Sequence, residues 1–173
     1  DGQHLKASLD FANSGNIHML DYKQLVQSLD SILQRGDTTL ALTFLNQLTK
    51  SVPAFTEGYA LKMKILLHQQ DWKSISNEID KAISNRRADV SPRDYSYLLA
   101  IKGITSGKRN RYDEAITRFN EAIEYDKHNA LAFLERGKIL LATGKNSRAI
   151  SDLKKASSLG QGEARLLLEG IDN

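Results

Sequence analysis

Apolar and small residues recur along this chain at the three- and four-residue intervals that are typical of amphipathic helices. One stretch places Leu99, Gly103 and Ser106 on a single helix face, and the next stretch does the same with Ala115 and Phe119. A short polar run separates the two stretches. The pattern therefore predicts two helices joined by a turn, which together form a helical hairpin.

The same pattern returns at a fixed offset of 34 residues. Four positions of one hairpin match four positions of the next: Gly103 and Gly137, Ala115 and Ala149, Phe119 and Leu153, Ala122 and Ala156. Further upstream, the offset relates Ala41, Leu45 and Leu48 to Ile75, Ile79 and Ala82. Repeated helical hairpins of this length predict an all-α solenoid, because each hairpin buries its apolar face only against its neighbours.

Two glycines occupy equivalent positions inside the predicted helices. A glycine in a helix interior costs about 1 kcal/mol relative to alanine, so Gly103 and Gly137 need a compensating role. We expect them to let the second helix of each hairpin approach closely, with Phe119 or Leu153 filling the adjacent space.

The segment from Tyr112 to Ile123, followed by Tyr125, Asp126 and Asn129, resembles the tetratricopeptide repeat family. The segments that begin at Gly36 and Asp71 resemble its inter-helix turn more weakly. The resemblance implies an all-α solenoid of stacked helical hairpins. It implies four repeats at 22–55, 56–89, 96–129 and 130–163, a six-residue insertion near 90–95, an N-terminal capping helix or half repeat in 1–21, and a short C-terminal helix in 164–173.

The first helix of the third hairpin precedes a basic run, Lys108 to Arg111. Because glycine commonly ends helices, we expect Ser106 and Gly107 to stop this helix about a turn early. The basic run would then project as an exposed loop that is dispensable for folding.

Composition narrows the chemistry of the chain. The 173 residues include 24 Lys and Arg, 21 Asp and Glu, four scattered His and no Cys. The absence of Cys excludes a disulfide framework, a thiolate zinc site and a cysteine nucleophile. Apolar runs of a few residues are far shorter than the roughly 20 that span a bilayer. We find no catalytic constellation, and we expect a soluble protein without enzyme activity, metal or cofactor.

The family resemblance also implies a function and a site. Its first helices line a concave groove that binds partner proteins, so we expect a non-enzymatic interaction module with an adaptor or scaffold role. Apolar residues flanked by lysines would suit a hydrophobic segment with acidic flanks. The residues that hold acidic chaperone tails in some family members are absent. The candidate partner-binding residues are Leu61, Lys64, Tyr97, Ile101, Ile104, Lys108, Leu131, Glu135 and Lys138.

Three alternatives stay open. The chain could self-associate through its end face from Leu166 to Ile171, it could be a repeat domain excised from a larger cell-envelope protein, or the basic run could serve an enzyme or a nucleic-acid binder. A net charge of +3 does not favour nucleic acid. The chain begins at Asp1, as a processed or excised piece would, and its compartment stays open between periplasm or cell envelope and cytoplasm. A competing interpretation of Tyr97, Ile101 and Ile104 is that they pack on neighbouring elements as core.

Overall fold

The computed structural model describes residues 29, 32–85 and 90–171, and all the regular secondary structure in these residues is helical. The predicted capping element in 1–21 and most of the first helix of the predicted repeat 22–55 lie outside the described residues. The helices are α3 (Thr38–Ser51), α4 (Thr56–His68), α5 (Trp72–Ser84), α6 (Pro92–Lys108), α7 (Tyr112–Tyr125), α8 (Ala130–Ala142), α9 (Asn146–Ser158) and α10 (Gly162–Ile171).

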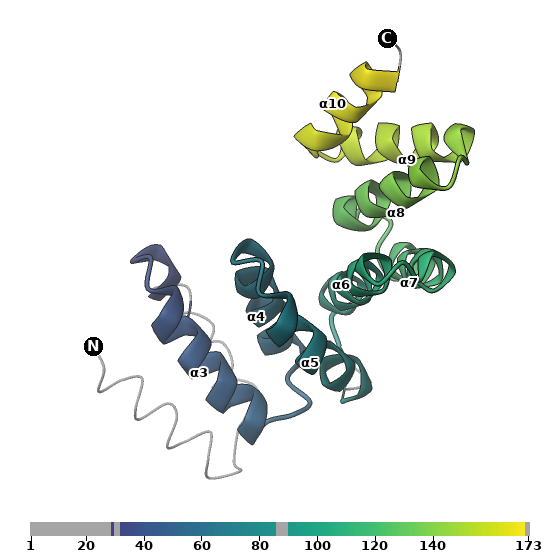
Figure 1. Ribbon diagram of the computed structural model, residues 1–173. Helices are drawn as coiled ribbons and strands as arrows, with labels where there is room; N and C mark the ends of the chain where they lie inside the picture. The colour runs from purple at the N-terminus through teal and green to yellow at the C-terminus, as the bar shows by residue number, and fades with distance from the viewer. Residues whose placement is uncertain (1–28, 30–31, 86–89, 172–173) are drawn as a thin grey trace.

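Successive helices pack against each other along the chain. The hairpins α4–α5, α6–α7 and α8–α9 stack in order, and α6 also contacts both α4 and α8. Figure 1 shows this stepwise arrangement from α3 near one end to α10 at the other. The prediction of an all-α solenoid of stacked hairpins is confirmed.

The turns inside the hairpins share one backbone feature. Gly36, Gln70, Asn110 and Gly144 all have a positive φ, between 56° and 76°. They follow one another at intervals of 34, 40 and 34 residues, which is the repeat period with six additional residues in the middle interval. A left-handed residue at this place ends the first helix and turns the chain toward the second.

Side chains cap the start of several helices. Asp37, Asp71, Ser91 and Asn129 each accept a hydrogen bond from the backbone N–H three residues later, over 2.9 to 3.4 Å. Such a bond satisfies one of the donors that the first helical turn leaves without a partner.

The predicted close approach of helices is confirmed at both glycines. A Cβ atom added at Gly103 would lie 2.7 Å from Cε1 of Phe119, and one added at Gly137 would lie 3.1 Å from the Leu153 side chain. Both large side chains are fully buried. The glycines therefore form recesses that the second helices fill.

The predicted early end of the first helix in the third hairpin is wrong. Helix α6 continues to Lys108. At the 34-residue offset Lys108 matches Ala142, which is the last residue of α8. Gly107 packs against Ile139 of α8: a Cβ atom added at Gly107 would lie 2.9 Å from the Ile139 Cδ1. This contact with α8 supports the last turn of α6. Lys108 to Arg111 are exposed, as expected.

The additional residues before the third hairpin lengthen its first helix. Helix α6 has 17 residues, whereas α4 and α8 have 13 each. Pro92 is the first residue of α6 and Ser91 caps it. Proline is favoured at a first helical position because its fixed φ is already helical and its missing N–H would have no partner there.

Candidate partner-binding surface

The first helices α4, α6 and α8 bring the nine predicted binding residues onto adjacent elements, because α6 packs between α4 and α8. Lys64 and Lys108 are exposed. Leu61, Tyr97, Leu131, Glu135 and Lys138 are half-buried. The remaining two residues, Ile101 and Ile104, are buried.

The burial of these two isoleucines corrects the prediction at their positions. Ile101 is 0% exposed and Ile104 is 8% exposed, and both belong to the main hydrophobic core. Helix α6 is covered by α4, α5, α7 and α8, so ten of its 17 residues are buried. Side chains with so little exposed surface offer a partner almost no contact area, so the competing interpretation as core holds for this pair.

Lys64 and Tyr97 connect α4 to α6 on this surface. The Lys64 Nζ lies 5.5 Å from the centroid of the Tyr97 ring, within the range of a cation–π contact. Burial raises the pKa of Tyr97 to about 12. The Tyr97 hydroxyl therefore stays neutral at physiological pH, and the ring offers a half-buried apolar surface beside a positive charge.

A second lysine contacts an aromatic ring at the end of α6. The Lys108 Nζ lies 4.1 Å from the ring centroid of Trp72, the first residue of α5. The sequence pattern did not indicate this contact, because Trp72 and Lys108 are 36 positions apart. Among the described residues, neither Lys64 nor Lys108 has a carboxylate within ion-pair distance, so both positive charges are available on the surface.

Lys138 differs from these two lysines. Its Nζ lies 2.8 Å from Glu135 Oε1 and 2.6 Å from Glu163 Oε1 of α10. Burial by itself lowers the pKa of Lys138, but the hydrogen bonds and charges of Glu135 and Glu163 outweigh burial and raise it. Two carboxylates around one ammonium leave this end of the surface negative, so the expectation that Lys138 attracts an acidic flank is not supported.

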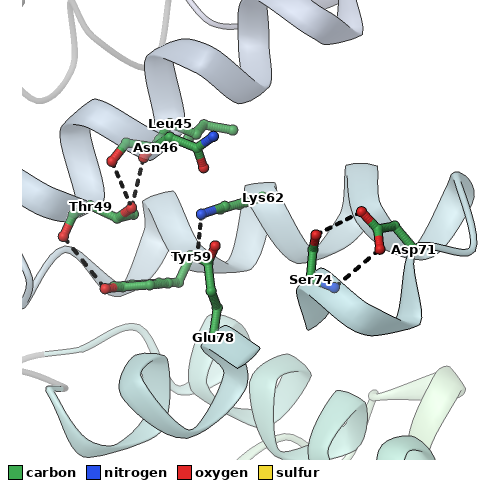
Figure 2. A network of polar contacts seen from close by, with 8 residues as sticks. All are labelled: Leu45, Asn46, Thr49, Tyr59, Lys62, Asp71, Ser74 and Glu78. Carbon is green, nitrogen blue, oxygen red and sulfur yellow. Dashed lines mark hydrogen bonds and ion pairs between the residues drawn. The ribbon is translucent and has the colours of Figure 1, made fainter. Parts of the chain in front are cut away.

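Ion pairs also join the two helices of a hairpin, at positions 16 residues apart. Lys62 of α4 pairs with Glu78 of α5, and Figure 2 shows the two side chains meeting between these helices. In the fourth hairpin, Arg136 Nε and Nη2 each lie 2.7 Å from an oxygen of Asp152. Both pairs are largely buried, so they fix the pairing of first and second helices.

The third hairpin lacks this pair. Its equivalent positions hold two cations, Lys102 and Arg118. Lys102 Nζ instead lies 2.7 Å from Asp80 of the preceding hairpin, and Arg118 Nη1 lies 2.8 Å from Glu121 on its own helix. The Nε atom of Arg118 is buried without a hydrogen-bond partner. Lys102 and Arg118 lie 16 residues apart in the sequence, like the ion pairs of the other two hairpins. The sequence alone does not indicate that this spacing joins two helices, so the two like charges are recognised as an exception only in the structure.

A polar network connects α3 to the second hairpin (Figure 2). The Tyr59 hydroxyl donates to the Thr49 carbonyl over 3.4 Å, and Thr49 Oγ1 donates to the Leu45 carbonyl over 2.8 Å. Burial, followed by the charge of Glu78, raises the pKa of Tyr59. The network satisfies polar groups inside the helix contact and so serves packing.

Two classes of site are not found in the described part of the chain. No group of three or more His, Asp or Glu side chains there is placed to hold a metal ion. None of the described helices has the length and apolar character needed to cross a membrane.

Comparisons with known proteins define the class of this solenoid. The family model of the tetratricopeptide repeat matches residues 108–144, from the end of α6 through α8. No curated protein matches the sequence. The fold is similar to PilF of Pseudomonas aeruginosa, with a TM-score of 0.64, 21% identity, and coverage of 92% of this chain and 67% of that one.

Two crystal structures of MamA are also similar. One has a TM-score of 0.60 and 15% identity, with coverage of 83% of this chain and 80% of that chain. The other has a TM-score of 0.61 and 17% identity, with coverage of 86% and 84%. At these identities the likeness concerns the fold.

The resemblance to the tetratricopeptide repeat family is confirmed, by the sequence in residues 108–144 and by the fold along the stack. Proteins of this family are generally non-catalytic modules that bind protein or peptide partners. The fold is thus that of a scaffold for protein–protein interaction.

Proposed function

We propose that this chain is a non-enzymatic adaptor or scaffold that binds a segment of a partner protein across α4, α6 and α8. The observation that carries the proposal is that Leu61, Tyr97 and Leu131 are half-buried apolar side chains on these three adjacent helices, and that the Lys64 Nζ lies 5.5 Å from the centroid of the Tyr97 ring. Half-buried side chains held by a packed core can contact a partner without a large loss of side-chain entropy.

The charges on this surface favour a partner of defined polarity. Lys64 and Lys108 would attract acidic residues toward α4 and α6. Glu135 and Glu163, with only Lys138 between them, would repel acidic residues from α8 and α10. We therefore infer a segment with apolar anchors, acidic residues at one end, and neutral or basic residues at the other.

Affinity capture with the 173-residue chain as bait, followed by binding measurements with the captured protein, tests this proposal. Lys64→Glu reverses an exposed charge on α4, so we expect weaker binding and a smaller salt dependence of binding. Lys154→Glu makes the same change at an exposed position on the second helix α9 and serves as the matched control.

The expected result is weaker binding by the Lys64 variant and unchanged binding by the Lys154 variant. Leu131→Ser should weaken binding further while far-UV circular dichroism shows unchanged helicity. Equal binding by the wild-type chain and both surface variants would place the partner elsewhere and overturn the proposal.

A further inference from the structure

The exposed side of α9 differs in charge from the exposed sides of α5 and α7. Together with the residue before the helix, it consists only of cationic, serine and asparagine side chains. The one carboxylate of α9, Asp152, is buried and paired with Arg136 of α8. This side of the helix therefore carries four positive charges and no exposed negative charge. We call it the α9 surface, and its cations are Lys145, Arg148, Lys154 and Lys155.

The four cations of the α9 surface are not neutralised within the described part of the chain. None of them takes part in the ion pairs found there. At the 34-residue offset, Arg148 and Lys155 match Glu114 and Glu121 of the third hairpin, which both pair with nearby arginines. The helical repeat itself therefore does not require positive charge at these positions.

The net charge of the whole chain does not reveal this segregation. The chain carries +3, so taking away the four positive charges of the α9 surface leaves a net charge of −1 for the remainder. The arrangement of charge on the surface decides where a polyanion binds. The low net charge of the chain is thus compatible with a polyanion bound at α9.

We propose that the α9 surface binds the phosphate backbone of a nucleic-acid duplex, without preference for base sequence. Lysine, arginine, serine and asparagine side chains are among those that contact phosphates in protein–nucleic acid complexes. Successive residues of a helix are turned by about 100°, so the exposed Ser151 lies between Lys154 on one side and Arg148 and Lys155 on the other. A short serine leaves room for phosphates between the longer cationic side chains.

The composition of the α9 surface favours a duplex over a protein segment or a single strand. Protein interfaces depend on buried apolar and aromatic anchors, and none of the exposed residues of α9 is apolar. Single-stranded nucleic acid is bound by stacking its bases on aromatic side chains, and this surface has none. Binding of a duplex backbone needs only positive charge, because the neutralised phosphates release their counterions.

The neighbouring helix favours a duplex over a flat anionic membrane. Arg136 of α8 contacts both Asn120 of α7 and Asp152 of α9, so α7 and α9 lie on the same side of α8. On α7, Asp113 and Glu124 are exposed. A broad membrane surface would approach these carboxylates as well as the α9 cations, whereas a cylindrical duplex can lie along α9.

Fluorescence anisotropy with a labelled DNA duplex of arbitrary sequence tests the proposal on the 173-residue chain. With four phosphate contacts, the affinity should fall about 100-fold between 50 and 200 mM salt, which corresponds to a slope of about −3.6 in a double-logarithmic plot. The double variant Lys154→Ser, Lys155→Ser keeps two of the contacts. Its affinity should be lower at every salt concentration and should fall only about tenfold over the same range.

The matched control is the double variant Lys73→Ser, Lys81→Ser on α5. Both lysines are exposed on the second helix of a hairpin, and Lys81 occupies the position in its repeat that Lys155 occupies in α9. The control loses the same amount of charge, so we expect it to bind the duplex with the affinity and salt dependence of the wild-type chain. Far-UV circular dichroism should show unchanged helicity in both double variants.

Three results would overturn the proposal. The first is no binding of the duplex at about 50 mM salt and about 100 μM protein, the weak end of non-specific binding. The second is an equal loss of affinity in the α9 and α5 variants, which would show that only total charge matters. The third is tighter binding of the single strand, of vesicles containing an anionic phospholipid or of polyglutamate than of the duplex.

The same variants separate this surface from the proposed partner-binding surface. Lys64 lies on α4, so Lys64→Glu should weaken binding of the partner protein and leave binding of the duplex unchanged. The Lys154→Ser, Lys155→Ser variant should show the reverse pattern. Either proposal can therefore fail while the other holds.

Discussion

The contact between Gly103 and Phe119 allows a quantitative prediction for Gly103→Ala. Alanine favours the helix by about 1 kcal/mol relative to glycine. Its Cβ, however, would lie 2.7 to 2.9 Å from three atoms of the Phe119 ring, closer than non-bonded atoms approach. Overpacking of this kind costs about 1 to 3 kcal/mol. The ring is fully buried and has little room to move, so we expect a net loss of about 1 to 2 kcal/mol of unfolding free energy.

A compensating substitution tests the cause of that loss. Phe119→Leu introduces the residue that Leu153 provides at the equivalent position of the fourth hairpin, and alone it should cost about 1 kcal/mol. The leucine side chain leaves more room for a Cβ at position 103. The double variant should therefore be more stable than the sum of the two losses predicts, by about 1 kcal/mol or more.

Urea unfolding followed by far-UV circular dichroism measures these differences. The control combines Phe119→Leu with Gly137→Ala, whose neighbour is Leu153 in another hairpin, and its two effects should add. The reasoning is refuted if Gly103→Ala is as stable as the wild-type chain, or if its effect adds to that of Phe119→Leu.

Three further predictions concern the core, the ion pairs and acid sensitivity. Ile101→Asp should unfold the chain, seen as lost helicity, because it places a carboxylate without a partner in the core; retained helicity would contradict the core assignment. Arg118→Asp should raise the unfolding free energy by about 0.5 to 1 kcal/mol, because it places a carboxylate opposite Lys102, and a lower melting temperature would contradict this. The Ser74 hydroxyl donates a hydrogen bond to the Asp71 carboxylate and is the main cause that lowers the pKa of Asp71 below its ordinary value of 3.8, and the Ser74 backbone N–H adds a smaller effect in the same direction. The free energy of unfolding that Asp71 contributes should be fully present above pH 3.8 and be lost as the pH falls through the lower pKa of the folded state. An NMR titration in which the pKa of Asp71 in the folded chain is not below 3.8 would contradict this prediction.

The sequence alone determined the elements and their repetition. Helical periodicity depends on residues three and four positions apart, so the positions of Gly103, Phe119 and their equivalents could be found without a structure. The 34-residue offset and the segment from Tyr112 to Ile123 identified the class of fold. Glycine inside a helix is unfavourable, and close packing of a large side chain can offset this cost. The pairing of Gly103 with Phe119 and of Gly137 with Leu153 could therefore be predicted from the sequence.

The tertiary structure decided which faces of these helices are free. An apolar stripe has the same period whether it lines a groove or a core, and Ile101 became core because α6 is packed between α4 and α8. Lys64 and Lys138 occupy comparable positions on their helices, yet only Lys138 lies beside two carboxylates, one of them on α10. Burial and charge pairing at each site depend on contacts between helices distant in sequence, and local periodicity carries no information about those contacts.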